Sequence, residues 1–365
     1  MTSIYGMPAI DCDVHVTLPN TGVLLPYLDS YWQEALTTRG MGKTLLNLSS
    51  YPLNTPLAMR PDWRANARDA ASPLEALKAD VLEVFGAEVA ICNCLYGVNA
   101  IHSEDMALVL CRALNMWMQE HWLDAEPRLR GSIVVPIEAP EAAAEEIERC
   151  AEDPRFVQVL LLSMGEMPLG RRFYWPIYKA AEKHGLAIAI HAGSTGRHPP
   201  TPAGWPSYYL EDYVNNAQAM ETQVLSLIGE GVFAKFPSLK VVCMEGGSSW
   251  LPGLMWRANK TWRGVRPEVP WIKRAPADIL RDHVRFTLQP FDAPPTEEQL
   301  AILFEQFGSD RIILFSSDYP HWHFDGTDAL PKGLPPSLLS KILFENALET
   351  YPKISLPALK KDPVT

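Results

Sequence analysis

The sequence predicts a single (β/α)8 barrel, the TIM-barrel class of α/β fold. Short apolar segments alternate with longer segments that carry apolar residues at helical spacing, and this pair of patterns recurs along the 365 residues. Most connections between the segments are short, which favours one continuous barrel domain over residues 1–365. No glycine-rich phosphate-binding loop follows the first apolar segment, and this argues against an open, dinucleotide-binding sheet.

Eight apolar segments have the composition of strands that are buried on both faces. The predicted strands are residues 9–16, 87–94, 131–136, 156–162, 186–191, 239–244, 284–288 and 312–315. Segments with apolar residues at helical spacing follow them, and the predicted helices are residues 104–122, 141–150, 175–184, 217–230, 251–262, 296–307 and 336–348.

Two long segments interrupt the alternation, so the barrel is expected to be distorted. The first, about residues 18–73, follows the first strand and is rich in Pro, Tyr, Trp and Arg. We expect it to form a lid or a wall of the active site, because loops of this length are usually functional or disordered. The second is a Pro-rich stretch over residues 198–209, after the fifth strand. The aromatic content of both insertions, together with a barrel exterior of apolar helices, predicts a homodimer.

Composition limits the partners that the chain is expected to bind. The formal net charge of -11 leaves no basic footprint for nucleic acid or an anionic membrane surface. No apolar run reaches the roughly 18 residues that span a bilayer, and the N-terminus lacks the features of a signal peptide. We therefore expect a cytoplasmic protein with a small-molecule partner. The six cysteines show no paired metal-binding spacing and are interpreted as reduced core residues.

Polar residues stand where several predicted strands end, and in barrels of this class the chemistry sits at those C-terminal ends. They are Asp13 and His15 after the first strand, His191 after the fifth, Glu245 after the sixth and Asp318 after the eighth. Each alone has a structural alternative, such as an ordinary turn for an acid or a hydrogen-bonded structural role for a histidine. Two histidines and three carboxylates at one end of a barrel, however, suit a divalent metal ion, Zn or Mn.

Five motifs, in order along nearly the whole chain, resemble those of the amidohydrolase-related family, often called amidohydrolase 2. They read IDCDVH, AIAIHAG, FPSLKVVCMEGGSSWLP, ILFSSDYPHW and KILFENALETYP. The resemblance implies a distorted TIM barrel with one catalytic divalent metal ion. The family includes nonoxidative decarboxylases of aromatic or unsaturated acids, lactone hydrolases and hydratases, so the resemblance does not by itself specify the reaction.

The resemblance places the metal ligands on Asp13, His15, His191 and Asp318. This sequence departs from the family pattern at two positions. Asp13 stands where the best-known members have His or Glu, which makes the site more anionic and favours Mn over Zn. Glu245 stands where the related decarboxylases carry a histidine that acts in proton transfer, and this departure argues against decarboxylation because a carboxylate repels an anionic substrate.

The sequence therefore predicts a metal-dependent hydrolase of a small cyclic or aromatic amide, imide, ester or lactone. A metal-bound water would attack the carbonyl, with Asp318 or Glu245 as the base. His321 is expected to contact the substrate or to brace Asp318, although a packing role beside Trp322 is equally compatible with the sequence. The alternatives are a nonoxidative decarboxylase of an aromatic or unsaturated carboxylic acid and, outside the enzymes, a metal-stabilised binding protein.

Overall fold

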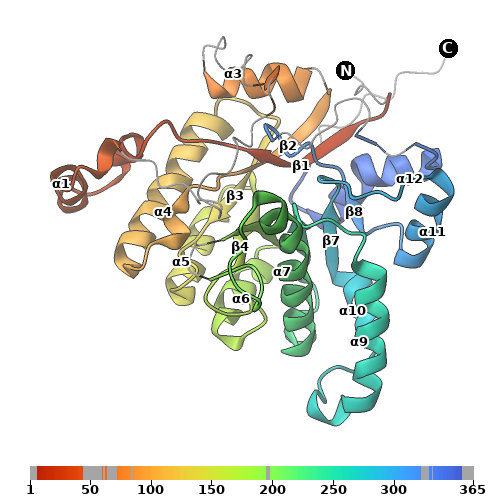
Figure 1. Ribbon diagram of the computed structural model, residues 1–365. Helices are drawn as coiled ribbons and strands as arrows, with labels where there is room; N and C mark the ends of the chain where they lie inside the picture. The colour runs from red at the N-terminus through yellow and green to blue at the C-terminus, as the bar shows by residue number, and fades with distance from the viewer. Residues whose placement is uncertain are drawn as a thin grey trace.

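The computed structural model describes residues 6–43, 60, 62–63, 72–83, 85–194, 198–321, 329–330 and 332–355. Within these residues, parallel strands form one eight-stranded sheet whose spatial order follows the sequence (Figure 1). The strands are β1 (Ala9–His15), β2 (Ala87–Asn93), β3 (Leu129–Val134), β4 (Phe156–Met164), β5 (Ala187–Ser194), β6 (Val241–Met244), β7 (Val284–Thr287) and β8 (Ile313–Leu314).

The sheet closes into a barrel because the segment that contains β8 pairs with β1. The Cys12 amide donates to the Phe315 carbonyl at 3.0 Å, and the His15 amide donates to the Tyr319 carbonyl at 2.7 Å. Val14 and Tyr319 also form a parallel bridge beyond the last residue of β8. The predicted (β/α)8 barrel is therefore confirmed.

Helices follow the strands along the chain and surround the sheet (Figure 1). Their apolar faces pack on the strands, whose side chains are almost all buried. The main helices are α4 (Glu104–Met118), α5 (Pro140–Cys150), α6 (Trp175–Lys183), α7 (Tyr209–Gly229), α9 (Leu251–Val265), α10 (Pro276–His283), α11 (Glu297–Phe307), α12 (Pro336–Ser340) and α13 (Asn346–Thr350). No helix in the described part of the chain has the length and apolar character needed to cross a membrane. The cytoplasmic location stays a prediction.

Helix α7 begins eight residues earlier than residues 217–230, the range predicted from the sequence. Its first two turns expose Leu210 (75%) and Val214 (62%) to solvent, so they lack the apolar stripe that marks a helix in a sequence. The helix begins there because the Glu211 carboxylate accepts hydrogen bonds from the amides of Ser207 (2.9 Å) and Tyr208 (2.8 Å). This capping extends α7 to the C-terminal end of the barrel.

The described part of the predicted insertion after β1 is partly helical. It contains η1 (Thr21–Tyr27) and α1 (Ser30–Thr38), and the Asp29 side chain caps α1 by accepting from the Trp32 amide at 3.0 Å. Residues 44–59, 61 and 64–71 of the predicted insert, about residues 18–73, lie outside the described residues. Its role as a lid or wall therefore stays a prediction, as does the extent of the domain, residues 1–365.

Candidate metal centre

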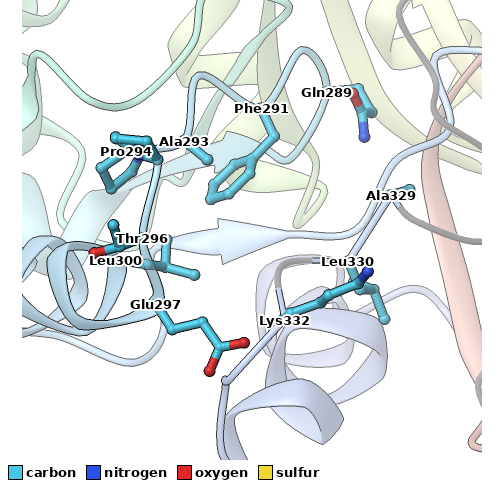
Figure 2. A pocket seen from close by; sticks show the side chains of 11 residues that line it. Gln289, Phe291, Ala293, Pro294, Thr296, Glu297, Leu300, Ala329, Leu330 and Lys332 are labelled. Carbon is cyan, nitrogen blue, oxygen red and sulfur yellow. The ribbon is translucent and has the colours of Figure 1, made fainter.

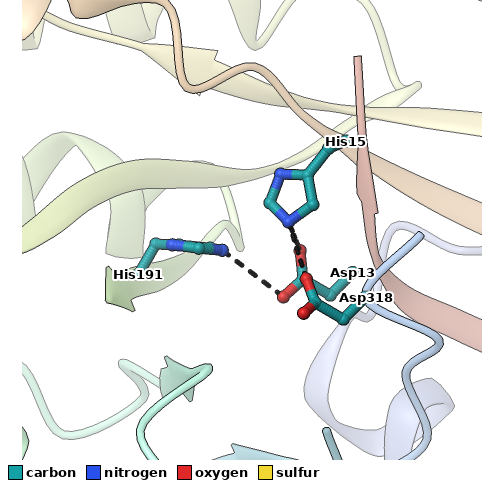
Figure 3. A group of neighbouring side chains, drawn as sticks. All are labelled: Asp13, His15, His191 and Asp318. Atoms are coloured by element: carbon teal, nitrogen blue, oxygen red, sulfur yellow. Dashed lines mark hydrogen bonds and ion pairs between the residues drawn. The ribbon is translucent and has the colours of Figure 1, made fainter. Parts of the chain in front are cut away.

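Four of the residues selected from the sequence meet at the C-terminal end of the barrel. Asp13 and His15 are two residues apart in β1 and therefore point to the same side of that strand. His191 comes from β5, and Asp318 follows β8. One ligand atom from each of the four residues lies within 4.8 Å of those from the other three, and all four side chains are buried (Figure 3).

The His191 imidazole is held so that Nε2 points at the other three residues (Figure 3). Its Nδ1 lies 2.6 Å from the Ala192 carbonyl oxygen, so Nδ1 carries the hydrogen and donates it. Its Nε2 lies 3.5 Å from Asp13 Oδ2 and 3.5 Å from Glu245 Oε2. Burial lowers the pKa of His191, but the charges of Asp13 and Glu245 outweigh that effect and raise the pKa to about 9.

The Asp13 carboxylate has no exposed surface, yet it is stabilised in its ionised form. Burial alone would raise its pKa, but the neighbouring His191 and His15 lower it below the usual value. Asp13 Oδ1 accepts a hydrogen bond from the Asn93 amide at 2.7 Å. Asp13 Oδ2 therefore remains as the oxygen that faces His191.

The Asp318 carboxylate contacts a third histidine, His321, which lies outside the group of four residues. Asp318 Oδ1 lies 2.8 Å from His15 Nε2 and 2.8 Å from His321 Nδ1. Burial opposes ionisation, but the two histidines lower the pKa of Asp318 well below its usual value. Asp318 has φ 55°, in the left-handed region that non-glycine residues rarely occupy. Such backbone conformations cluster at functional sites, where the surrounding structure holds them.

Glu245 lies beside this group of four residues, and like Asp318 it has a left-handed backbone conformation, with φ 58°. Asp318 and Glu245 are the two non-glycine residues with positive φ in the described part of the chain. Glu245 Oε1 lies 3.3 Å from His321 Nδ1 and accepts from the Tyr213 hydroxyl at 3.3 Å. His15, Glu245, Asp318 and His321 thus make a second group of possible ligands that overlaps the first.

The first group has the chemistry that a divalent metal ion requires. It offers two imidazole nitrogens and two carboxylates without a thiolate, a set that suits Zn or Mn. Asp13 Oδ2 and His191 Nε2 are buried and make no hydrogen bond to a described residue; they face each other at 3.5 Å, which is longer than the hydrogen bonds that buried polar atoms normally make. A cation between them would satisfy both atoms, so the residues fit a resident metal ion.

Three polar neighbours of the site were missed in the sequence. Asn93 ends β2 and could have been found by the strand-end rule that selected Asp13. Asp11 is buried in β1, and its Oδ1 accepts from the amides of Asp13 (3.2 Å) and Ser317 (3.0 Å). Tyr213 lies in the part of α7 that the apolar pattern did not reveal.

A cavity of about 370 Å³ lies between the segment that follows β7 and the segment that precedes α12 (Figure 2). Its lining residues include Gln289, Phe291, Leu300, Leu330 and Lys332, and none of the four candidate ligands lines it. The Gln289 amide donates to the Ser316 hydroxyl at 3.0 Å, which joins the cavity wall to the segment between β8 and Asp318.

Comparison with known proteins gives consistent matches. An amidohydrolase family model matches residues 10–353. A gamma-resorcylate decarboxylase from Polaromonas sp. is 29% identical over 242 residues, which cover 62% of this chain and 71% of that protein. An amidohydrolase structure from Mycobacterium avium subsp. paratuberculosis has a TM-score of 0.71 and 23% identity, covering 94% and 98% of the two chains. A manganese-containing 5-carboxyvanillate decarboxylase from Novosphingobium aromaticivorans has a TM-score of 0.68 and 19% identity, covering 95% and 96%.

These matches correct one prediction made from the sequence. The main prediction, hydrolysis, is wrong, because the named relatives are decarboxylases. The error has a physical source: the prediction considers the charge of Glu245 alone, whereas in the structure Glu245 lies beside His321 and Tyr213. The family model covers nearly the whole chain and the fold agrees with it. The chain therefore belongs to the amidohydrolase family and is an enzyme of that superfamily.

Proposed function

We propose that the chain is a metal-dependent, nonoxidative decarboxylase of a hydroxylated aromatic carboxylic acid. The observation that carries the proposal is that His321 contacts both carboxylates and is more exposed to solvent than either of them. Its Nδ1 lies 2.8 Å from Asp318 and 3.3 Å from Glu245, and its side chain is 20% exposed, against 0% and 8% for the two acids. The decarboxylases among the relatives support the same reaction class.

Decarboxylation requires a proton donor and does not require a nucleophile. When an aromatic carboxylate loses carbon dioxide, the electron pair of the broken carbon–carbon bond stays on the ring carbon, and one proton must be added to that carbon. His321 is the group that we assign to this transfer. Its Nδ1 faces Asp318 and Glu245, so the transferred proton is assigned to Nε2, and water replaces it after each turnover.

Asp13, His15, His191 and Asp318 are the residues that would hold the metal ion, for which we propose Mn²⁺. When bound, the ion supplies positive charge that binds substrate oxygens and draws electron density from the ring. The ion would also offset the negative charge of Asp13, Glu245 and Asp318, which disfavours binding of an anionic substrate. Two carboxylate ligands favour Mn²⁺, and the manganese in a neighbouring decarboxylase structure supports this choice.

We also propose that the protein is a homodimer. Tyr208 (72% exposed), Leu210 (75%) and Val214 (62%) expose apolar side chains at the N-terminal end of α7. Exposed aromatic and aliphatic side chains that lie close together are more common at protein interfaces than elsewhere on a surface. This part of α7 adjoins the second predicted insertion.

The test of the proposed reaction is a substrate panel with two readouts. Protein loaded with Mn²⁺ is incubated with 2,6-dihydroxybenzoate, 5-carboxyvanillate and related phenolic acids, and product mass and released carbon dioxide are measured. We expect at least one acid to yield a product that lacks its carboxyl group, and the His321→Gln variant to lose this activity. Metal-loaded protein that releases no carbon dioxide from any acid in the panel would contradict the proposal.

A further inference from the structure

A chain of buried polar side chains crosses four strands of the barrel and ends on Asp13. Asn93 at the end of β2, Ser132 in β3 and Gln158 in β4 have no exposed surface, and neither has Asp13 in β1. Polar groups in a barrel interior are unfavourable unless they are hydrogen-bonded, and apolar side chains would fill the same space. The position of these residues therefore calls for an explanation.

The donors among these side chains all point toward Asp13, from Gln158 through Ser132 to Asn93. Gln158 Nε2 donates to Ser132 Oγ at 2.8 Å and to Asn93 Oδ1 at 3.1 Å, and Ser132 Oγ donates to Asn93 Oδ1 at 2.5 Å. Two donors on the Asn93 oxygen determine the orientation of its amide, because a flipped amide would place NH₂ against both donors. The Asn93 NH₂ group must then face Asp13.

The Asn93 NH₂ group donates hydrogen bonds to two acceptors. One is Asp13 Oδ1, at 2.7 Å, and the other is Met244 Sδ, at 3.6 Å. A hydrogen bond to an ionised carboxylate is stronger than one between neutral groups, so the Asp13 contact dominates. It restrains one carboxylate oxygen and leaves Oδ2, which is buried and makes no hydrogen bond to a described residue, facing His191.

We propose that Asn93 is a positioning residue for the metal centre: oriented by Ser132 and Gln158, it holds the Asp13 carboxylate so that Oδ2 faces the ion. This inference rests on the proposed metal role of Asp13 and extends it to residues outside the ligand set. Hydrogen bonds to ligands orient them, and loss of such a bond typically weakens metal binding by 10- to 100-fold.

The experiment compares two substitutions of buried asparagines. Asn93→Leu removes the donor to Asp13 with little change of volume. Asn115→Leu is the matched control, because Asn115 is also fully buried and donates to a carboxylate, Glu146 Oε1, at 2.8 Å. The hydrogen bonds of Asn115 join α4 to β3 and α5, and none of them involves a described residue of the metal site.

The readout is the Kd for Mn²⁺, measured by calorimetry on full-length, folded protein after removal of metal, together with the melting temperature. We expect Asn93→Leu to raise Kd by about 10- to 100-fold, and Asn115→Leu to lower the melting temperature while changing Kd by less than about twofold. Equal changes of Kd in the two variants, or an unchanged Kd in Asn93→Leu, would overturn the inference.

A smaller substitution decides the outcome if Asn93→Leu does not fold. Ser132→Ala removes the shorter of the two hydrogen bonds that orient the Asn93 amide, leaves the longer one from Gln158 at 3.1 Å, and keeps the Asn93 donor to Asp13 in place. We expect its Kd to rise by about threefold or more, a weaker effect than the loss of a direct partner, and an unchanged Kd would overturn the inference. Wild-type protein that binds no Mn²⁺ would instead refute the proposed metal centre itself, so the two failures are distinguishable.

Discussion

Proton competition at His191 predicts how metal affinity depends on pH. The raised pKa of about 9 means that, without metal, His191 Nε2 carries a proton at neutral pH. A metal ligand must be neutral imidazole, so binding of the ion displaces that proton. At pH 7, about two units below this pKa, about one molecule in a hundred has a neutral His191. We therefore expect affinity for Mn²⁺ to be about 100-fold lower at pH 7 than above pH 9, equivalent to about 2.7 kcal/mol.

Calorimetry in buffers of different ionisation enthalpy measures both the affinity and the number of protons released. We expect the affinity to fall by up to tenfold per unit as pH decreases from 8.5 to 6.5, with about one proton released per ion. Asp13 and Asp318 do not contribute in this range because their pKa values are lowered. His191→Asn should weaken binding and flatten the dependence. His283→Asn, at a buried histidine bonded to the Leu239 carbonyl, should change neither.

Protonation of His191 weakens metal binding, but it stabilises the fold of the metal-free protein. Because the folded pKa of His191 lies above its usual value of 6.5, its imidazolium stabilises the fold fully below about pH 6.5, and this contribution is lost as pH rises through about 9. The difference in melting temperature between wild type and His191→Asn should therefore shrink over that range. An affinity that stays constant from pH 6.5 to 8.5, without proton release, would refute this reasoning.

Four further outcomes follow from the site. His321→Gln should lower kcat by about 10²- to 10⁴-fold and change the Mn²⁺ Kd little, in a combined steady-state and binding assay. Glu245→Gln should lower kcat by about tenfold with a nearly unchanged melting temperature, because His321 keeps its Asp318 partner. With free Mn²⁺ at 100 times its Kd, bound metal should stabilise the protein by about 2.7 kcal/mol, so removal of the metal should lower the melting temperature. Sedimentation at micromolar concentration should give twice the 40.8 kDa chain mass, and a single monomeric species would refute the dimer.

Residues in regular positions of the barrel could be predicted from the sequence. Short apolar strands and the strand-end rule were sufficient to select Asp13, His15 and His191, because backbone periodicity determines where such side chains point. Asp318 and Glu245 were selected by the same rule, although their left-handed backbone conformation was not predicted. That conformation depends on tertiary contacts, such as the bond from the Asp318 amide to the Asp13 carbonyl at 3.1 Å.

Other parts of the site could not be predicted because they depend on contacts between distant segments. Tyr213 reaches Glu245 from a helix whose first turns are exposed, so no apolar pattern marks them. The role of Asn93 depends on Ser132 and Gln158, which lie 39 and 65 residues away in the sequence. The reaction class was wrong because the identity of one residue, Glu245, does not determine chemistry without the position of its neighbour His321.

The most direct test of the metal centre is anomalous diffraction from crystals of the protein grown or soaked with Mn²⁺. Data collected on either side of the manganese absorption edge identify the ion independently of its surroundings. We expect one anomalous peak enclosed by Asp13, His15, His191 and Asp318. A peak enclosed instead by Glu245 and His321, or no peak in protein that is otherwise well ordered, would contradict it.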